Sequence, residues 1–323
     1  MVLVGETVVR RNPPRAASDH VNGRSTMNGA FLRARARVHR SRRAVALLTG
    51  VVLASGALVV SGPTATAAPS LASRATQMSA PFRVASFNIL GASHTGPRSS
   101  FDDYKPRMRR TLRVIDRRAF TVVGLQEFQK VQYDMFMRRT DGAWGVYPGL
   151  EEGLRPVQNS IIWRTDTWER VEAHTYQIPY FHGNIVDQPY VKLRNKVTGA
   201  TVWVINTHNP ANSKGDASAY RQTALENQAA LVNTLKTTGV PVLLVGDFND
   251  RDHAFCFLTS EAPLKAANGG SNGSTCSPPS PRIIDWIFLS PSVQVQKYAW
   301  LDRAVDNITD HKVPYADVSV PLP

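Results

Sequence analysis

The 323 residues would suffice for two domains, but the first 70 or so do not resemble folded protein. The formal net charge is +13, yet residues 1–67 hold 10 basic and 2 acidic residues, so the remaining 28 basic and 23 acidic residues carry only +5. That mild excess is compatible with a polyanionic substrate without requiring one. Two cysteines without a Cys-x-x-Cys pair exclude a zinc site of the usual kind.

The N-terminal region has the layout of an export signal. Residues 1–43 form a basic leader that we expect to be disordered, and residues 44–68 supply an apolar core and a small-residue cleavage region. We expect cleavage near Ala67 or Ala68, a secreted product and no membrane span in the mature chain. An uncleaved anchor is the alternative, because the apolar core of 17 residues is at the lower limit for a span. Residues 69–80 are interpreted as a linker to a single domain at 81–323.

Within this domain, apolar runs rich in β-branched residues predict seven strands, at 82–89, 121–126, 160–164, 201–206, 241–245, 283–289 and 315–320. Helical spacing of Met108, Leu112, Ile115 and Ala119 predicts one helix, and the stripe of Leu225, Ala229 and Val232 predicts another. Helices intervene between only some of the strands. The pattern therefore indicates a layered α/β fold with mixed sheets.

The first predicted helix lies in a segment crowded with arginine, which contains Arg107, Arg109, Arg110, Arg113, Arg117 and Arg118. We interpret these residues as a solvated helix face, because a phosphate-binding patch would require them to converge on a cleft. We interpret His94, His174, His182 and His253 as loop or surface histidines, since they belong to no motif.

Cys256 and Cys276 are expected to pair in an oxidising compartment and to close a loop rich in Gly, Ser and Asn. The chain-entropy model gives such a loop of about 20 residues roughly 3 kcal/mol of stabilisation. We therefore predict a structural disulfide.

Polar residues stand at the ends of strands that are far apart in the sequence. Asn88, Glu127 and His208 follow three of the apolar runs, and the run at 241–245 leads into Gly-Asp-Phe-Asn with Asp247 and Asn249. Asp285 lies inside an apolar run and needs a cationic partner, and Asp310-His311 precede the last strand. Open α/β sheets build their sites from such strand ends, so we expect these side chains to converge.

The chemistry of this set points to a phosphate ester. Carboxylate and amide oxygens suit a hard divalent cation such as Mg²⁺, with Mn²⁺ or Ca²⁺ as alternatives. Phosphate esters need charge compensation and an aligned water, which metal and imidazole can supply. The sequence has no Gly-x-Ser-x-Gly and no Gly-x-x-x-x-Gly-Lys motif. Metal-assisted hydrolysis is the reading that fits best.

These residues occur in short motifs whose order resembles the endonuclease/exonuclease/phosphatase superfamily, also called deoxyribonuclease-I-like. The motifs are Ser86-Phe87-Asn88, Leu125-Gln126-Glu127, Asn206-Thr207-His208, Gly246-Asp247-Phe248-Asn249, Ile284-Asp285-Trp286-Ile287 and Asp310-His311. The resemblance covers 81–323. It implies a four-layer α/β sandwich with two packed mixed β-sheets, an edge active site and a catalytic role for the domain.

The resemblance also implies residue roles. Asn88, Glu127 and Asp310 would bind or position the metal. His208 and His311, the latter oriented by Asp285, would surround the scissile phosphate, and Asp247 with Asn249 would activate water or stabilise the transition state.

The function expected from these observations is an exported, Mg²⁺-dependent phosphoesterase, of nuclease-like phosphodiesterase type. The alternatives are a sphingomyelinase-like enzyme, a sugar or inositol phosphate phosphatase and, in another class, an inactive cell-surface binding module. A phosphate-ester substrate, nucleic acid among the candidates, is the expected partner, and no stable protein partner is implied.

Overall fold

The computed structural model describes residues 77–323, which include the whole predicted catalytic domain. The expected basic leader at 1–43 and the expected signal segment at 44–68 lie outside the described residues, as does most of the linker. Between residues 77 and 323, no helix is both long enough and apolar enough to cross a membrane.

Two six-stranded sheets form the centre of the domain. The first sheet has the order β13-β14-β1-β2-β4-β3, with bounds Gln294–Leu301, Val313–Ser319, Phe82–Asn88, Val122–Gln126, Ser160–Arg164 and Trp144–Tyr147. The second has the order β5-β6-β7-β8-β12-β9, with bounds Trp168–Pro179, Ile185–Asn195, Thr201–His208, Val242–Asp247, Asp285–Leu289 and Lys265–Ala266. Only the central pairs β1 with β2 and β7 with β8 are parallel, so both sheets are mixed. All seven strands expected from the sequence are present.

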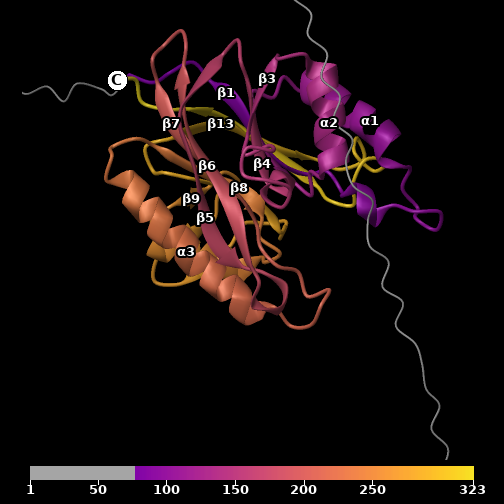
Figure 1. Cartoon of the computed structure of the whole chain (residues 1–323). Helices are drawn as coiled ribbons and strands as arrows, with labels where there is room; N and C mark the ends of the chain where they lie inside the picture. Colours follow the sequence, from indigo (N-terminus) through magenta and orange to yellow (C-terminus); the bar gives the residue numbers. More distant parts are fainter. Residues whose placement is uncertain (1–76) are drawn as a thin grey trace, which may run out of the picture. The chain divides into compact units, whose positions relative to one another are not determined.

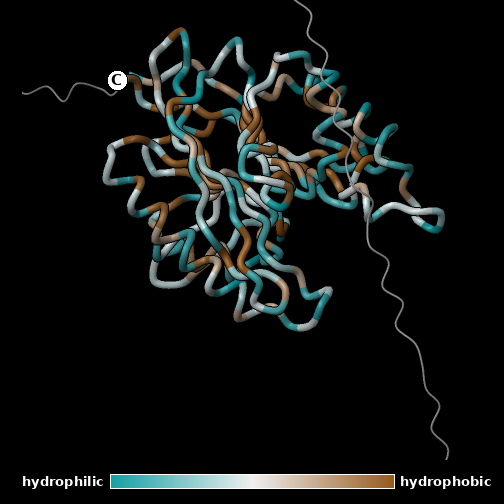
Figure 2. Tube along the Cα trace, viewed as in Figure 1, coloured by the Kyte–Doolittle hydropathy of each residue, from teal (hydrophilic) through white to brown (hydrophobic). Residues whose placement is uncertain are grey.

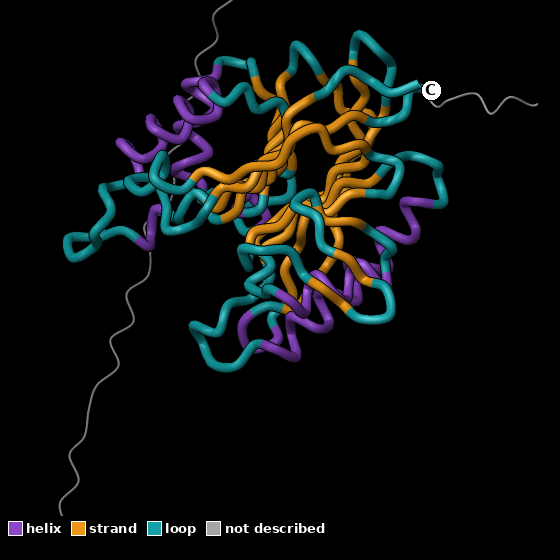
Figure 3. The backbone as a smooth tube through the Cα atoms, turned by 180° about the vertical axis from the view of Figure 1, so that it is seen from behind, coloured by secondary structure: helices purple, strands orange, loops and turns teal. Residues whose placement is uncertain are grey.

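Helices cover the outer face of each sheet. Against the first sheet lie α1 (Tyr104–Arg117) and α2 (Lys130–Thr140), and against the second lie α3 (Ser218–Lys236) and α4 (Asp252–Glu261). Figures 1 and 3 show the strands in the middle with the helices on either side. The predicted four-layer α/β sandwich is therefore confirmed.

The layers are held together by three clusters of buried apolar side chains. The cluster between the sheets contains Val84, Val122, Val204 and Val245, each with no exposed area. The other two clusters lie between each sheet and its own helices. Strands buried on both faces are continuous hydrophobic runs, which explains why the sequence revealed them. Figure 2 shows these runs as hydrophobic segments within the strands.

One polar clamp crosses the core between the sheets. Asn206 on β7 is fully buried and donates from its amide nitrogen to the carbonyls of Leu125 (2.8 Å) and Ser160 (3.2 Å). Its oxygen accepts a hydrogen bond from Gln126 Nε2 at 2.6 Å. A Cβ at Gly124 would lie 2.5 Å from the Asn206 oxygen, so only glycine permits this approach. The clamp fixes how the strand ends of the two sheets face each other.

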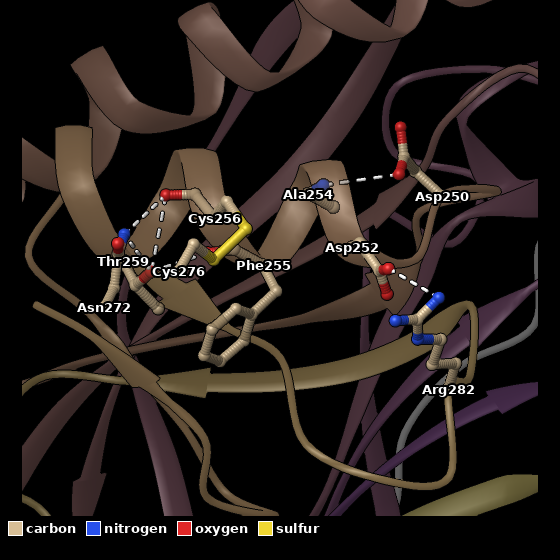
Figure 4. The surroundings of a disulfide bond; sticks show 9 residues. All are labelled: Asp250, Asp252, Ala254, Phe255, Cys256, Thr259, Asn272, Cys276 and Arg282. Atoms are coloured by element: carbon tan, nitrogen blue, oxygen red, sulfur yellow. Dashed lines mark hydrogen bonds and ion pairs between the residues drawn. A yellow bond between two sulfur atoms is a disulfide. The ribbon is translucent and has the colours of Figure 1, made fainter. Parts of the chain in front are cut away.

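Cys256 on α4 forms the expected disulfide with Cys276 on β11 (Cys276–Ser277) across a sequence separation of 20 residues. Strand β11 pairs with β10 (Ser271–Asn272), and the Asn272 amide donates to the Cys256 carbonyl at 2.9 Å. Figure 4 shows this contact beside the disulfide. The loop that leads back to β12 is therefore fastened to α4 at two points.

Candidate active site

Asp247 lies at the centre of the site because of strand register. It ends β8, where it is the ladder partner of His208 on the parallel strand β7 and of Asp285 on the antiparallel strand β12. All three side chains are buried, with exposed fractions of 1% for Asp247, 9% for His208 and 3% for Asp285. His208 Nε2 lies 3.4 Å from Asp247 Oδ2. A single sheet edge thus assembles an imidazole and two carboxylates.

Asn88 joins this group from the other sheet. It ends β1, which packs against β8 and β12, and its side chain is fully buried. Its amide nitrogen donates to Asp247 Oδ2 at 3.2 Å and to Glu127 Oε1 at 3.1 Å. The Asn88 side-chain oxygen accepts from the backbone N–H of Leu90 at 3.1 Å. The nitrogen of Asn88 therefore faces the carboxylates and holds two of them in place.

Glu127 follows β2 directly and is held from both sides. Its Oε2 accepts a hydrogen bond from the backbone N–H of Gly91 at 2.7 Å. Burial favours the neutral acid, but His208 and the N–H donors of Gly91 and Asn88 outweigh it, so the pKa of Glu127 is lowered. Glu127 is therefore an anion at neutral pH.

The backbone is strained at three points around the site. Leu90, Glu127 and Asn249 have φ values of 57°, 59° and 49°, a left-handed conformation that is uncommon for residues other than glycine. Such strain persists only where the surrounding structure enforces it, and it is concentrated at functional sites.

Asn249 supports Asp247 through its backbone. The Asn249 N–H donates to Asp247 Oδ1 at 2.9 Å, while its side-chain amide donates to the carbonyl of Asn209 at 2.9 Å. Asn209 N–H in turn donates to the carbonyl of Asp247 at 2.9 Å. Both oxygens of Asp247 thus have assigned donors, which fixes the direction of its carboxylate.

His311 and Asp285 form a hydrogen-bonded pair, with Nδ1 donating to Oδ2 at 2.9 Å. The other ring nitrogen, Nε2, lies 3.7 Å from Asp247 Oδ2 and 3.4 Å from Asn88 Nδ2. Burial disfavours the imidazolium, but Asp285, Asp247 and Asp310 outweigh burial and raise the pKa of His311 to about 10. Burial, reinforced by Asp247 and opposed by His311, raises the pKa of Asp285 to about 7.

Asp310 is placed differently from the other residues singled out by the sequence. It is exposed, and within residues 77–323 no hydrogen bond or ion pair joins it to Asn88 or Glu127. Its neighbour Thr309 donates from Oγ1 to the carbonyl of Asn88 at 2.8 Å, which brings the segment against β1. The field of Asp310 also raises the pKa of His311. The structure thus brings Asp310 to the margin of the site.

The donor chemistry of the site fits a divalent cation. Four carboxylates, those of Glu127, Asp247, Asp285 and Asp310, surround the two histidines, and such a concentration of negative charge is costly without a compensating cation. Ligand atoms of Asp247, Asp285 and His311 lie within 4.8 Å of one another. Asp285 already bonds to His311 through Oδ2, whereas its Oδ1 is buried without a hydrogen-bond partner among the described residues. The oxygens of Glu127 and Asp247 each accept one hydrogen bond and retain a lone pair that a cation could use.

Sequence reasoning missed several residues that support the site. Arg107, expected on a solvated face, is 1% exposed, and its Nη1 donates to the carbonyls of Ile89 (2.8 Å), Leu90 (2.7 Å) and Ile308 (3.1 Å). The expectation of solvation was wrong for Arg107. The side chain binds together the loop after Asn88 and the loop before Asp310, so the crowding of arginines hid one with a structural role.

Four neighbours of the site residues were also missed. Gln188 accepts the backbone N–H of His208 at 2.9 Å, and the Tyr180 ring meets the His208 ring edge to face at 5.9 Å. His94, expected at the surface, is 57% exposed but lies 3.5 Å from Glu127. Asn209 could have been suspected, because it directly follows His208. Gln188, Tyr180 and His94 had no sequence signal.

Comparisons with known proteins match the part of the chain that carries these residues. The model of the Endonuclease/Exonuclease/phosphatase family matches residues 85–311. No curated protein matches the chain.

Solved structures of similar fold cover most of the chain. A family protein from Bacteroides thetaiotaomicron is 18% identical over 77% of this chain and 98% of its own, with a TM-score of 0.58. The human Nocturnin catalytic domain with bound sulfate is 16% identical over 75% and 97%, with a TM-score of 0.56. A mannosyl-6-phosphatase from B. thetaiotaomicron is 18% identical over 73% and 99%, with a TM-score of 0.56.

Proposed function

Because this chain belongs to the endonuclease/exonuclease/phosphatase family, we propose that it is an exported, divalent-metal-dependent phosphodiesterase of the nuclease type. Hydrolysis of phosphoester bonds is the reaction class of the family.

The observation that carries the proposal is the convergence on Asp247 of side chains from both sheets. His208 and Asp285 are its ladder partners, and Asn88 reaches its Oδ2 from the opposite sheet. A binding module has no need for buried carboxylates beside histidines, because each buried charge is costly. An active hydrolase explains why such a group is maintained.

Asp247 is our candidate for the residue that takes a proton from the attacking water. Its carboxylate is oriented by the Asn249 N–H and the Asn88 amide. A general base must be held in a fixed orientation within hydrogen-bond distance of the water whose proton it takes. His208, 3.4 Å away, would bind a phosphoryl oxygen on the same side.

His311 would contact the phosphate as well, because its Nε2 lies near the same Asp247 oxygen as His208 does. Its Nδ1 is occupied by Asp285, so the ring is fixed and Nε2 is the nitrogen directed toward Asp247. Nε2 is therefore the atom that would bind a phosphoryl oxygen. Asp285 acts through His311 and is a positioning residue.

Glu127 and Asp310 would hold the cation, with Asn88 positioning Glu127 through its amide nitrogen. When bound, a divalent cation would offset the charge that develops on the phosphate. Mg²⁺ is the first candidate, because it prefers oxygen ligands and takes only one or two carboxylates.

Export is supported by the disulfide, since disulfides persist in oxidising compartments. The basic and apolar N-terminal segments agree with it at the level of sequence.

The test is a substrate panel of plasmid DNA, RNA, sphingomyelin, a sugar phosphate and bis(4-nitrophenyl) phosphate, each with Mg²⁺, Mn²⁺ or Ca²⁺. We expect cleavage of nucleic acid and of the synthetic diester, loss of both in EDTA, and recovery when Mg²⁺ is restored. Asp247→Asn keeps the shape of the side chain and should abolish turnover. Full turnover in EDTA, or an active Asp247→Asn variant, would disprove the proposal. Cleavage of sphingomyelin or the sugar phosphate alone would replace the nuclease assignment.

A further inference from the structure

A pocket opens beside the candidate site and shares three residues with it. Its volume is about 210 Å³. Three of its lining residues, Asp285, Asp310 and His311, belong to the site already described. The rest of the lining consists of Arg251, Pro281, Arg282, Ile283, Ile284 and Lys312. Pockets that enclose a whole small ligand measure roughly 300–1,000 Å³, so this one suits a single group of a larger substrate.

The charge of this pocket differs from that of the site. The site gathers carboxylates around Asp247, whereas the pocket adds three cationic side chains, Arg251, Arg282 and Lys312. Within residues 77–323, Arg251 has no ion-pair partner. The two acidic residues that line the pocket, Asp285 and Asp310, belong with His311 to the part shared with the site. The pocket thus adds three cationic side chains next to His311.

The other two cations have acidic partners that an anion could replace. Arg282 contacts Asp252 at 2.9 Å, with 66% and 38% of the two side chains exposed (Figure 4). Lys312 contacts Asp302 at 3.2 Å, with 41% and 57% exposed. Exposed ion pairs contribute about 0–1 kcal/mol, and a phosphate group forms stronger, charge-assisted hydrogen bonds with guanidinium groups. These cations are thus available to a phosphate.

The loop that carries Arg282 is anchored to α4. The disulfide ties Cys276 to Cys256, and Asn272 also donates to Thr259 Oγ1 at 2.8 Å, as Figure 4 shows. The backbone before Arg251 is also held, because Trp286 Nε1 donates to the carbonyl of Asp250 at 3.0 Å. Both arginines therefore stand on supported backbone, which favours binding because less freedom is lost.

We infer that this pocket is a subsite for a second phosphate group, adjacent to the scissile phosphate, and that the protein prefers substrates bearing such a phosphate, as a polynucleotide does. The inference rests on the proposed function and names the substrate feature that the site would select. Arg251 and Arg282 would contact the second phosphate directly, and Lys312 would contribute charge.

The test compares matched esters that differ only in the second phosphate. Thymidine 5′-(4-nitrophenyl phosphate) and thymidine 3′-(4-nitrophenyl phosphate) are each assayed with and without a phosphate on the other hydroxyl. The two regioisomers cover both directions of binding. We expect the added phosphate to raise kcat/KM about tenfold or more in at least one pair, the effect of a charge-assisted hydrogen bond. In the Arg251→Gln/Arg282→Gln variant, this ratio should fall to about one.

Each ratio compares kcat/KM with and without the added phosphate in one preparation of the protein. A smaller folded fraction lowers both values equally and leaves the ratio unchanged. Arg170→Gln/Arg194→Gln removes the same charge from β5 and β6, away from the pocket, and should keep the wild-type ratio. Calorimetry with thymidine 3′,5′-bisphosphate gives a second reading that needs no turnover, and the pocket variant should bind it about tenfold more weakly.

A wild-type ratio near one, or a raised ratio that survives in the pocket variant, would overturn the subsite. The subsite would also be overturned if inorganic phosphate bound to the pocket while the added phosphate on the ester left kcat/KM unchanged. That result would indicate a site for free phosphate. If wild type cleaves none of the esters, the proposed function fails. Calorimetry then still decides the subsite, since equal affinity of wild type and pocket variant would reject it.

Discussion

Asp247 and Asp285 are direct partners across the antiparallel ladder between β8 and β12, so two buried carboxylates stand side by side at the end of the second sheet. Like charges in this position are destabilising. His311 relieves part of that cost by bonding to Asp285, and His208 lies beside Asp247 on the other flank. The geometry thus concentrates negative charge where a cation and a protonated imidazole would be stabilised.

Cation binding should be measurable as stability. Because a ligand that binds only the folded protein stabilises it, millimolar Mg²⁺ should raise the melting temperature of wild type. Glu127→Gln removes one ligand charge and should shrink the shift to less than half. Glu151→Gln, an exposed residue paired with Arg170, serves as the control and should behave as wild type. An undiminished shift in Glu127→Gln would exclude that residue as a ligand.

His311 and Asp285 should act as one unit in catalysis. His311→Gln is expected to lower kcat for a phosphodiester about 10²–10³-fold, the range for losing a group that stabilises charge in the transition state. Asp285 acts through His311, so the double variant Asp285→Asn/His311→Gln should be no slower than His311→Gln alone. His174→Gln, at an exposed position, should leave kcat as it is. Multiplicative losses in the double variant would show that Asp285 has a separate role.

Arg107 should matter to both stability and activity. Arg107→Met leaves the carbonyls of Ile89, Leu90 and Ile308 without their charged donor, which should cost about 3 kcal/mol in urea unfolding. Because those loops carry Asn88 and Asp310, kcat of the folded fraction should also fall. Arg109→Met, on the exposed face of the same helix, is the matched control. Equal stability of the two variants would contradict the clamp.

The disulfide should stabilise the domain. Replacing both cysteines, in Cys256→Ser/Cys276→Ser, should lower the free energy of unfolding by about 3 kcal/mol, since the bond closes a loop over a separation of 20 residues. Reduction of wild type with dithiothreitol should cause the same loss. The double-serine variant itself should be insensitive to the reductant, and a further loss there would point to an effect other than the bond.

The pair of Arg83 and Asp317 should give part of the acid dependence of stability. Arg83 donates to both oxygens of Asp317, at 2.6 and 2.8 Å, and this hydrogen bonding lowers the pKa of Asp317 in the folded state. Its contribution is therefore complete above the unfolded pKa of about 3.9 and is lost as the pH falls through the lower folded value.

Asp317→Asn should accordingly be less stable than wild type at pH 7, and the difference should vanish toward about pH 2. Urea unfolding at a series of pH values measures this difference. Asp166→Asn provides a comparison, because Asp166 forms an exposed pair with Arg164 and should change stability little. A difference for Asp317→Asn that is constant with pH would show that the charge is not the cause.

The sequence alone determined the central strands and the residues at their ends. Strands such as β8 are buried on both faces, and the sequence shows this as an apolar run that ends in Asp247. The long hairpin of β5 and β6 was not foreseen, because most of β5 is exposed or half-exposed and its polar residues follow no clear alternation. Helices α2 and α4 were missed as well, since their apolar residues form only weak stripes.

Tertiary structure decided the pairings that turn those residues into a site. Asp247 meets His208 and Asp285 through ladder register, and it meets Asn88 because the two sheets pack at a fixed offset. Neither register nor offset can be read from a single strand, because each depends on segments far apart in the chain. The burial of Arg107 has the same origin, since its partners Ile89 and Ile308 come from two loops far apart in the chain. Residue types follow from the local sequence, whereas their distances and pKa values follow from the packing of the whole domain.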